Sequence, residues 1–98
     1  MERQKAISII EAKSAPFKKL CVTALFLYGS TARGEANADS DIDIFVDYDS
    51  QSHFSLFDLL EIKHTLEDES GISVDVTTRD ALHPRLRERI EQSAVRVF

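Results

Sequence analysis

The sequence has 98 residues, the length of one domain, and we expect that domain to span residues 1–98. An apolar content of 43% and a charged content of 30% are typical of a globular protein and argue against disorder. No apolar run approaches the roughly 20 residues of a membrane span, and the charged start of the chain does not resemble a secretory signal. The formal net charge of −5 argues against binding of long nucleic acid, which needs clustered Lys and Arg.

These features favour a cytoplasmic protein. The single cysteine, Cys21, cannot form an internal disulfide and agrees with a reducing compartment. The negative charge still permits a small phosphorylated ligand, because a bound metal ion can reverse the local field.

Apolar periodicity predicts helices that alternate with three or four strands. In chain order we expect a helix over residues 2–20, a strand over 22–28, a short helix or turn over 31–37, a strand over 41–48, a helix over 54–69, a strand over 72–77, a helix over 84–92 and a short strand over 94–98. This alternation indicates an α/β (α+β) domain, with a small mixed sheet flanked by helices in two or three layers.

Local signals refine these helices. Pro16 either kinks the first helix or starts a separate turn. Ser55 and Asp58 form a possible capping box, and Gly71 is placed to end the same helix in a left-handed conformation. The side chains expected to face the core from the two later helices are Leu56, Leu59, Leu60, Leu66, Leu86 and Ile90.

Gly29-Ser30 follows directly after the first buried strand. Glycine permits a sharp turn and close approach of a ligand, and Ser30 offers a hydroxyl beside the free N–H groups of a following helix. These groups suit a phosphate. The alternative is a plain turn that ends the strand, with Ser30 as helix cap.

Asp41 and Asp43 are two apart on the second strand, so both project from the same face. Adjacent carboxylates repel each other unless a cation lies between them, and Mg²⁺ prefers oxygen ligands of this kind. The alternative is a solvent-facing edge strand. Asp47 shares this face, but it lies about 13 Å beyond Asp43 at strand rise, and we interpret it as solvated.

Asp75 lies on the polar face of an otherwise apolar strand, between Val74 and Val76. If this strand neighbours the strand of Asp41, three carboxylates converge, and we expect them to fall within one metal cluster. Two metal ions about 4 Å apart could clamp the attacking and leaving oxygens of a phosphoryl group. Asp75 is then the best candidate for general base.

The order of these pieces resembles a known pattern. Gly29-Ser30, ten residues, Asp41-Ile42-Asp43 and a later strand aspartate are similar to the nucleotidyltransferase motif of the DNA polymerase beta superfamily. Residues 29–43, GSTARGEANADSDID, resemble the minimal nucleotidyltransferases, the MNT or MntA-like proteins. The resemblance extends along nearly the whole chain.

This resemblance implies ATP as substrate, Mg²⁺ as cofactor, and the nucleotidyltransferase fold. It implies that Gly29 and Ser30 bind the triphosphate and that Asp41, Asp43 and Asp75 are the catalytic metal ligands. It also implies an antitoxin paired with a small helical HEPN partner, which would receive adenylate on a side chain. Arg33, three residues after Ser30, could turn back toward a phosphate or be solvated.

Two other functions remain alternatives. The chain could be a binding module that neutralises its partner by docking alone. It could also transfer a nucleotide to a small hydroxylated molecule or to an RNA end, although its small size and negative charge argue against RNA. Homo-oligomers and hetero-oligomers are both compatible with the sequence.

Overall fold

The computed structural model describes residues 2–35 and 41–98, and the last two residues of the expected short helix or turn, 36 and 37, lie outside that description. The elements in chain order are α1 (Arg3–Glu11), α2 (Ser14–Lys19), β1 (Val22–Tyr28), α3 (Gly29–Ala32), β2 (Ile42–Tyr48), α4 (Leu56–Ser70), β3 (Val74–Thr78), the 3-10 helix η1 (Arg79–Ala81), α5 (Pro84–Ser93) and β4 (Val95–Arg96). Each strand that the sequence predicts is therefore present.

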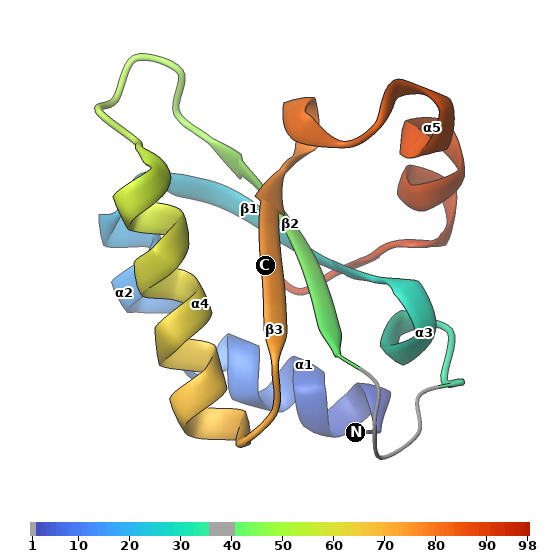
Figure 1. Ribbon diagram of the computed structural model, residues 1–98. Coiled ribbons are helices and arrows are strands. Elements are labelled where there is room, and N and C mark those ends of the chain that lie inside the picture. The colour runs from blue at the N-terminus through green and yellow to red at the C-terminus, as the bar shows by residue number, and fades with distance from the viewer. Residues whose placement is uncertain (1, 36–40) are drawn as a thin grey trace.

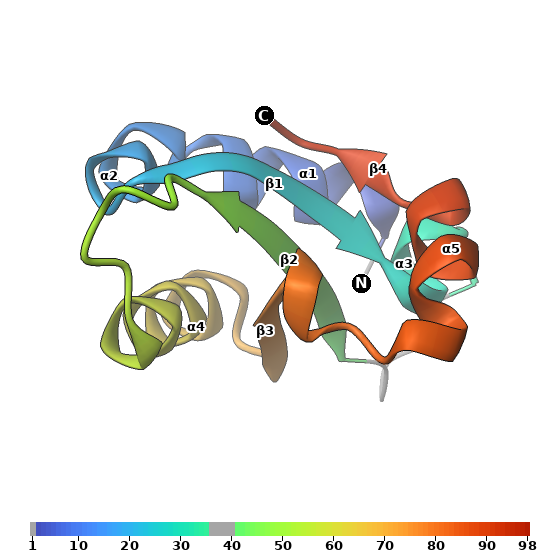
Figure 2. The same ribbon diagram turned by 90° about the horizontal axis from the view of Figure 1, so that it is seen from above.

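The four strands form one mixed sheet in the order β3-β2-β1-β4. β1 pairs antiparallel with β2 and with β4, whereas β2 and β3 are parallel neighbours connected through α4. Figure 1 shows α4 on one side of the sheet and α5 on the other. In Figure 2, α1 and α2 run beside β1, and α3 and α5 lie together at the end of β1. This confirms the α/β class and the mixed sheet.

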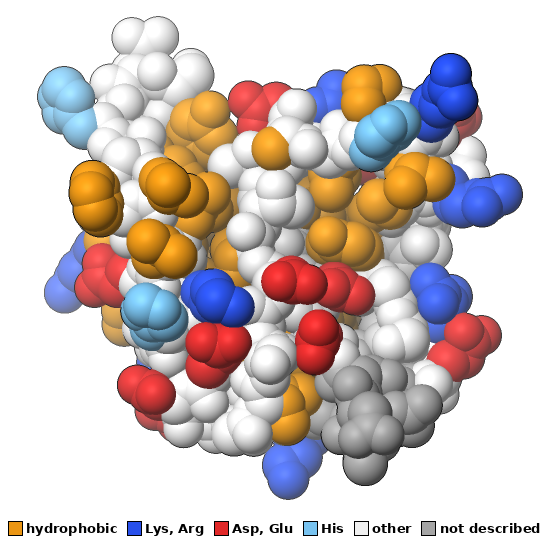
Figure 3. All heavy atoms as spheres, in the orientation of Figure 1, with side chains coloured by type: hydrophobic (Ala, Val, Ile, Leu, Met, Phe, Trp, Pro, Cys, Tyr) orange, Lys and Arg blue, Asp and Glu red, His pale blue; other side chains and the backbone are white. Residues whose placement is uncertain are grey.

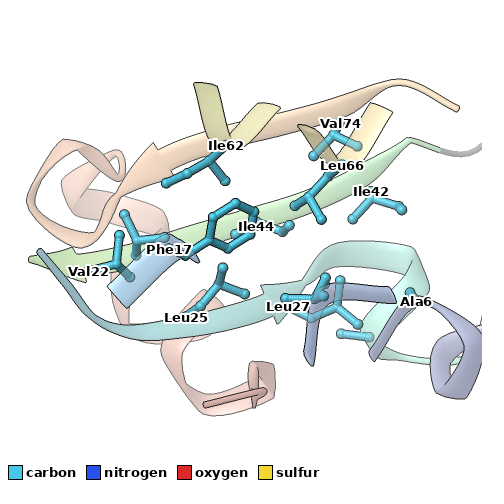
Figure 4. Packing of buried hydrophobic residues seen from close by; sticks show 13 residues of the cluster. Ala6, Phe17, Val22, Leu25, Leu27, Ile42, Ile44, Ile62, Leu66 and Val74 are labelled. Carbon is cyan, nitrogen blue, oxygen red and sulfur yellow. The ribbon is translucent and has the colours of Figure 1, made fainter. Parts of the chain in front are cut away.

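One face of the sheet holds the hydrophobic core. Ile42, Ile44 and Val46 of β2 are at most 1% exposed, as the alternation along this strand predicts. Figure 4 shows Phe17 from α2 and the α4 side chains packed over this face. Each fully buried side chain of this size stabilises the fold by about 1.5–3 kcal/mol relative to an exposed one. The core fixes the face on which the polar side chains of β2 must lie.

The first helix differs from its prediction. It is divided into α1 and α2 with the break at Ala12 and Lys13, so the alternative of a kink at Pro16 is wrong. Pro16 lies in the first turn of α2, as the alternative of a separate turn predicted, and its missing N–H has no helical partner to lose there. α3 begins at Gly29, two residues earlier than the predicted short helix. No helix within residues 2–35 and 41–98 is long and apolar enough to span a bilayer.

α4 is bounded as the sequence predicts. Ser55 and Asp58 form the capping box, and Gly71 ends the helix with a φ of 74°. The prediction of which α4 side chains face the core is partly wrong. The buried side chains are Ile62 and Leu66, whereas Leu56 and Leu60 are 69% and 38% exposed. At 100° per residue, Leu60 is turned about 120° around the helix from Leu66, so both cannot face the same sheet.

The prediction that Leu86 and Ile90 of α5 face the core is also wrong in part. Leu86 is 48% exposed, Ile90 is half-buried, and α5 contains no buried residue. The helix is attached to the sheet through polar contacts instead. Arg87 donates two hydrogen bonds to the carbonyl oxygen of Arg79, at 3.2 and 2.8 Å, and Glu91 forms an ion pair with Arg79 at 3.3 Å.

Candidate functional site

Gly29 stands where β1 turns into α3. Its φ is +75°, a left-handed conformation that side chains disfavour. A Cβ atom built on Gly29 would overlap the carboxylate oxygen Oδ2 of Asp43 and would lie 3.3 Å from its Cγ. Only glycine therefore lets the Asp43 carboxylate lie against the backbone at the start of α3.

The aspartates of β2 and β3 are register neighbours. Asp43 is opposite Tyr28 of β1 on one side and opposite Asp75 of β3 on the other, so the three side chains form a row across the sheet. The row lies on the face away from the core. The condition set by the sequence is met, because β3, which carries Asp75, neighbours β2, which begins directly after Asp41. Figure 3, which views the molecule from the β3 side, shows acidic side chains gathered near the middle of that view.

Asp41 precedes β2 and is exposed. Its carbonyl oxygen accepts a hydrogen bond from the Thr31 hydroxyl at 3.4 Å, and Thr31 is only 1% exposed. This contact ties α3 to the start of β2. The glycine turn and the first aspartate are therefore held together by a buried polar side chain that lies between them in the sequence motif.

The row carries concentrated negative charge. Burial raises the pKa of Asp43, and the carboxylates of Asp75 and then Asp41 raise it further, while the charge of Arg33 opposes the shift. Burial, followed by the charges of Asp43 and Asp75, also raises the pKa of the Tyr28 phenol. A cation placed among these groups would relieve the repulsion.

The donor set suits a hard divalent cation, because carboxylate oxygens are the ligands that Mg²⁺ prefers. The close fit of Asp43 against Gly29 keeps one carboxylate fixed on this face. The predicted single cluster is not formed, however: among residues 2–35 and 41–98, no three His, Cys, Asp or Glu side chains lie close enough to hold one ion. Neighbouring strands are about 4.8 Å apart, and like charges on them repel.

The predicted phosphate-binding residues lie at the start of α3. Ser30 is the second residue of this four-residue helix and is half-buried. The carbonyl oxygen of Ser30 accepts the N–H of Glu35 at 2.9 Å. Arg33 forms an exposed ion pair with Glu35 at 3.0 Å, and 49% of its side chain is accessible. A phosphate contact from Arg33 would require it to leave Glu35, and its role there stays a prediction.

Sequence reasoning missed Arg79, which comes directly after β3. Its guanidinium donates to both carboxylate oxygens of Asp47, at 2.8 and 3.0 Å, and lies 4.8 and 5.0 Å from the ring centres of Phe26 and Phe45. The two rings are stacked at 4.7 Å. Asp47 is therefore paired rather than solvated, and the only signal was its place on the face of Asp43.

The glycine turn, the aspartate pair and the strand order can be compared with known proteins. Residues 7–97 match the nucleotidyltransferase domain family. The chain belongs to this family. The match covers every site residue described above, from Gly29 to Asp75, and it makes the chain an enzyme of the nucleotidyltransferase class.

Two similar proteins carry the name protein adenylyltransferase. A candidate protein adenylyltransferase of Methanocaldococcus jannaschii is 44% identical over 72 residues, which are 74% of this chain and 75% of that protein. The protein adenylyltransferase MntA of Thermococcus cleftensis is 33% identical over 76 residues, which are 78% of this chain and 75% of that protein.

Solved structures agree with the nucleotidyltransferase fold. A candidate minimal nucleotidyltransferase superposes with a TM-score of 0.82 and 32% identity, over 97% of this chain and 95% of that one. A toxin–antitoxin complex with AMP-PNP superposes with a TM-score of 0.70, over 90% of this chain and 72% of that one. At 19% identity, the second likeness concerns the fold alone.

Proposed function

We propose that this nucleotidyltransferase transfers AMP from ATP to a hydroxyl group of a partner protein, as the antitoxin of a toxin–antitoxin pair. The relatives named protein adenylyltransferases, MntA among them, support the reaction. The fold shared with the toxin–antitoxin complex supports the biological setting. The observation that carries the proposal is the pairing of Asp43 with Asp75 opposite the Gly29 turn.

In this proposal the start of α3 holds the triphosphate. The free N–H groups at the start of α3 and the Ser30 hydroxyl donate to phosphate oxygens, and Gly29 leaves room for the Asp43 carboxylate beside them. Arg33 offers a further positive charge after it leaves Glu35. The α-phosphorus then lies over the row that contains Asp43 and Asp75.

The chemistry is a substitution at the α-phosphorus of ATP. The acceptor oxygen forms a bond to phosphorus, the bond between phosphorus and the α–β bridging oxygen breaks, and pyrophosphate leaves with that electron pair. Asp75, the carboxylate on the edge strand, takes the proton from the acceptor hydroxyl. The acceptor therefore approaches from the β3 side of the sheet.

Asp41, Asp43 and Asp75 would hold Mg²⁺, two ions in the complete site. When bound, Mg²⁺ supplies charge neutralisation for the triphosphate and the leaving pyrophosphate. The raised pKa of Asp43 agrees with this role, because repulsion from Asp75 and Asp41 contributes to the shift and a cation reverses that contribution. Since the three side chains are not gathered around one point, we expect ligand binding to draw them together.

The proposed partner is a small helical protein of the HEPN type, and the location is the cytoplasm. The test is incubation of the purified chain with a HEPN-type partner protein, ATP and Mg²⁺, followed by mass spectrometry of the intact partner. We expect the partner to gain the mass of AMP, and Asp43→Asn to abolish the gain. An unmodified partner that is nevertheless neutralised would favour docking over catalysis.

Docking alone is the second candidate, and one surface favours it. The first turns of α4 expose Leu56, Phe57 and Leu60, at 69%, 82% and 38%. Apolar side chains gather over this end of α4 in Figure 3. Exposed apolar groups in a cluster are typical of protein contact surfaces. If docking alone neutralises the partner, Phe57→Ser should abolish neutralisation and Asp43→Asn should not.

A further inference from the structure

The outer edge of β3 is held by an ion pair from α4. Within residues 2–35 and 41–98, β3 is an edge strand, so no neighbouring strand binds its outward N–H and C=O groups. Lys63 donates from Nζ to the carbonyl oxygen of Val74 at 2.8 Å. Glu67 accepts the N–H of Val74 at 3.1 Å, through the same carboxylate oxygen Oε2 that binds Lys63 at 3.1 Å. Both outward backbone groups of Val74 are therefore bound.

The opposite side of this segment is fixed by the sheet. The N–H of Ile42 donates to the carbonyl oxygen of Ser73 at 3.0 Å, and Val74 is opposite Ile42 in the parallel ladder. The Val74 side chain is fully buried in the core. Asp75 is the next residue. Its backbone position is fixed by the α4 contacts of Val74, by the pairing of Ser73 with Ile42, and by burial of the Val74 side chain.

We propose that Lys63 and Glu67 are positioning residues for the transfer reaction, because they fix the strand that carries Asp75 beside Asp43. This inference rests on the proposed function. A catalytic carboxylate needs placement to within about 0.5 Å, and residues that orient such ligands commonly change metal affinity or activity about 10- to 100-fold when they are removed. An edge strand without an outer neighbour is the element of the site that most needs such support.

The charges suit this role. The hydrogen bond from Val74 and then that from Lys63 lower the pKa of Glu67, so its carboxylate stays ionised at neutral pH. Side chains of Lys63 and Glu67 are only 33% and 28% exposed, so the pair lies close against the protein surface. Hydrogen bonds to charged groups are about twice as strong as neutral ones.

A matched control lies on the same helix. Lys13 and Glu69 form an ion pair of the same length, 3.1 Å, with side chains 31% and 50% exposed. Glu69 makes none of the β3 contacts that Glu67 makes. Glu69→Gln therefore removes an ion pair from α4 without releasing Val74, whereas Glu67→Ala removes both contacts of the carboxylate.

The experiment measures two quantities for wild type, Glu67→Gln, Glu67→Ala and Glu69→Gln. The first is the amide exchange rate of Val74, recorded by NMR without nucleotide, which reports opening of the strand edge. The second is the Mg²⁺ concentration that half-saturates ATP binding in a calorimetric titration. We expect Glu67→Ala to speed the exchange of Val74 and to raise the Mg²⁺ requirement, each about tenfold. Glu67→Gln, which keeps an acceptor oxygen, falls between, and Glu69→Gln matches wild type.

Faster exchange in Glu67→Ala with a Mg²⁺ requirement within about twofold of wild type would overturn the inference. The pair would then only protect the strand edge. Unchanged exchange of Val74 would overturn it too. A different result, no ATP binding by wild type at any Mg²⁺ concentration, would contradict the proposed function and the positioning role together. The exchange rates of Val74 would then still show whether Glu67 holds the outer edge of β3.

Discussion

The carboxylate of Asp43 fills the space that a side chain at residue 29 would occupy, so Gly29 and Asp43 fit against each other across the end of β1. A Cβ on Gly29 would overlap Oδ2 of Asp43 and approach its Cβ to 3.4 Å. The two positions are fourteen residues apart in the sequence, 29 and 43. Their contact explains why a glycine turn and a strand aspartate occur together in one motif.

Gly29→Ala should therefore abolish Mg²⁺-dependent ATP binding. The new methyl group displaces Asp43, and the left-handed backbone adds strain of about 1–2 kcal/mol. Gly34→Ala is the matched control, because Gly34 has a φ of +72° but a Cβ there meets no atom within 4 Å among the described residues other than its chain neighbours. Calorimetric titration and denaturant unfolding measure the two effects separately. Equal loss of ATP binding in both variants would show that strain alone, and not contact with Asp43, is responsible.

The raised pKa of Asp43 predicts a pH-dependent stability. Since the folded chain holds this proton more tightly than the unfolded chain, the free energy of unfolding falls as pH rises from about 4 through the folded pKa, and it stays lower above it. Asp43→Asn should thus raise the free energy of unfolding near neutral pH in chelator, by less than about 1 kcal/mol because the group is half exposed.

This gain should disappear near about pH 3, where both chains carry no charge at residue 43. Excess Mg²⁺ should stabilise wild type and leave Asp43→Asn unchanged, since only a chain that binds the ion gains from it. Denaturant midpoints in chelator and in Mg²⁺ give all of these values. A variant less stable than wild type at neutral pH would mean that Asp43 makes a favourable contact without metal.

Arg79 should contribute to stability through its planar shape as well as its charge. It pairs with Asp47 through two hydrogen bonds and lies over the stacked rings of Phe26 and Phe45. We expect Arg79→Met to lower the free energy of unfolding by about 1–2 kcal/mol, with Arg79→Lys recovering less than half of that loss. Arg33→Met, which removes the exposed pair with Glu35, should change it by less than about 0.5 kcal/mol. Full recovery with Lys would show that charge alone matters.

The faces of α4 can be tested by two substitutions. Ile62 is fully buried, and Ile62→Ala should lower the free energy of unfolding by about 2–5 kcal/mol. Phe57 is 82% exposed, and Phe57→Ser should change it by less than about 0.5 kcal/mol. Urea unfolding followed by circular dichroism measures both. A large loss in Phe57→Ser would mean that this surface is covered in solution, for instance by a second copy of the chain.

Much of the fold follows from local sequence. The alternation along 42–48 predicts which side chains of β2 enter the core, and the capping box and Gly71 predict both ends of α4. The errors arise where a helix packs by only part of its length. Leu56 and Leu86 belong to periodic patterns, but they are 69% and 48% exposed, and nothing in the sequence shows which turns of a helix become covered.

The candidate site could also be predicted only in part from the sequence. Residue order predicts that Asp41 and Asp43 share a face, because the period of a strand is two. Pairing of Asp43 with Asp75 depends on a parallel neighbour, and the lengths of the connecting segments did not determine it. Contacts that join distant elements, such as Arg79 with Asp47 and Lys63 with Val74, have no signature in spacing and emerge only from the packed chain.

The central claim is that the Asp43 row binds ATP together with Mg²⁺. Its most direct test is isothermal titration of the purified chain with ATP, with and without Mg²⁺, beside the double variant Asp41→Asn plus Asp43→Asn. We predict binding that requires Mg²⁺ and is lost in the double variant, which should remain folded because both substitutions preserve side-chain size. Equal binding by wild type and the double variant, or binding that needs no Mg²⁺, would contradict the site described here.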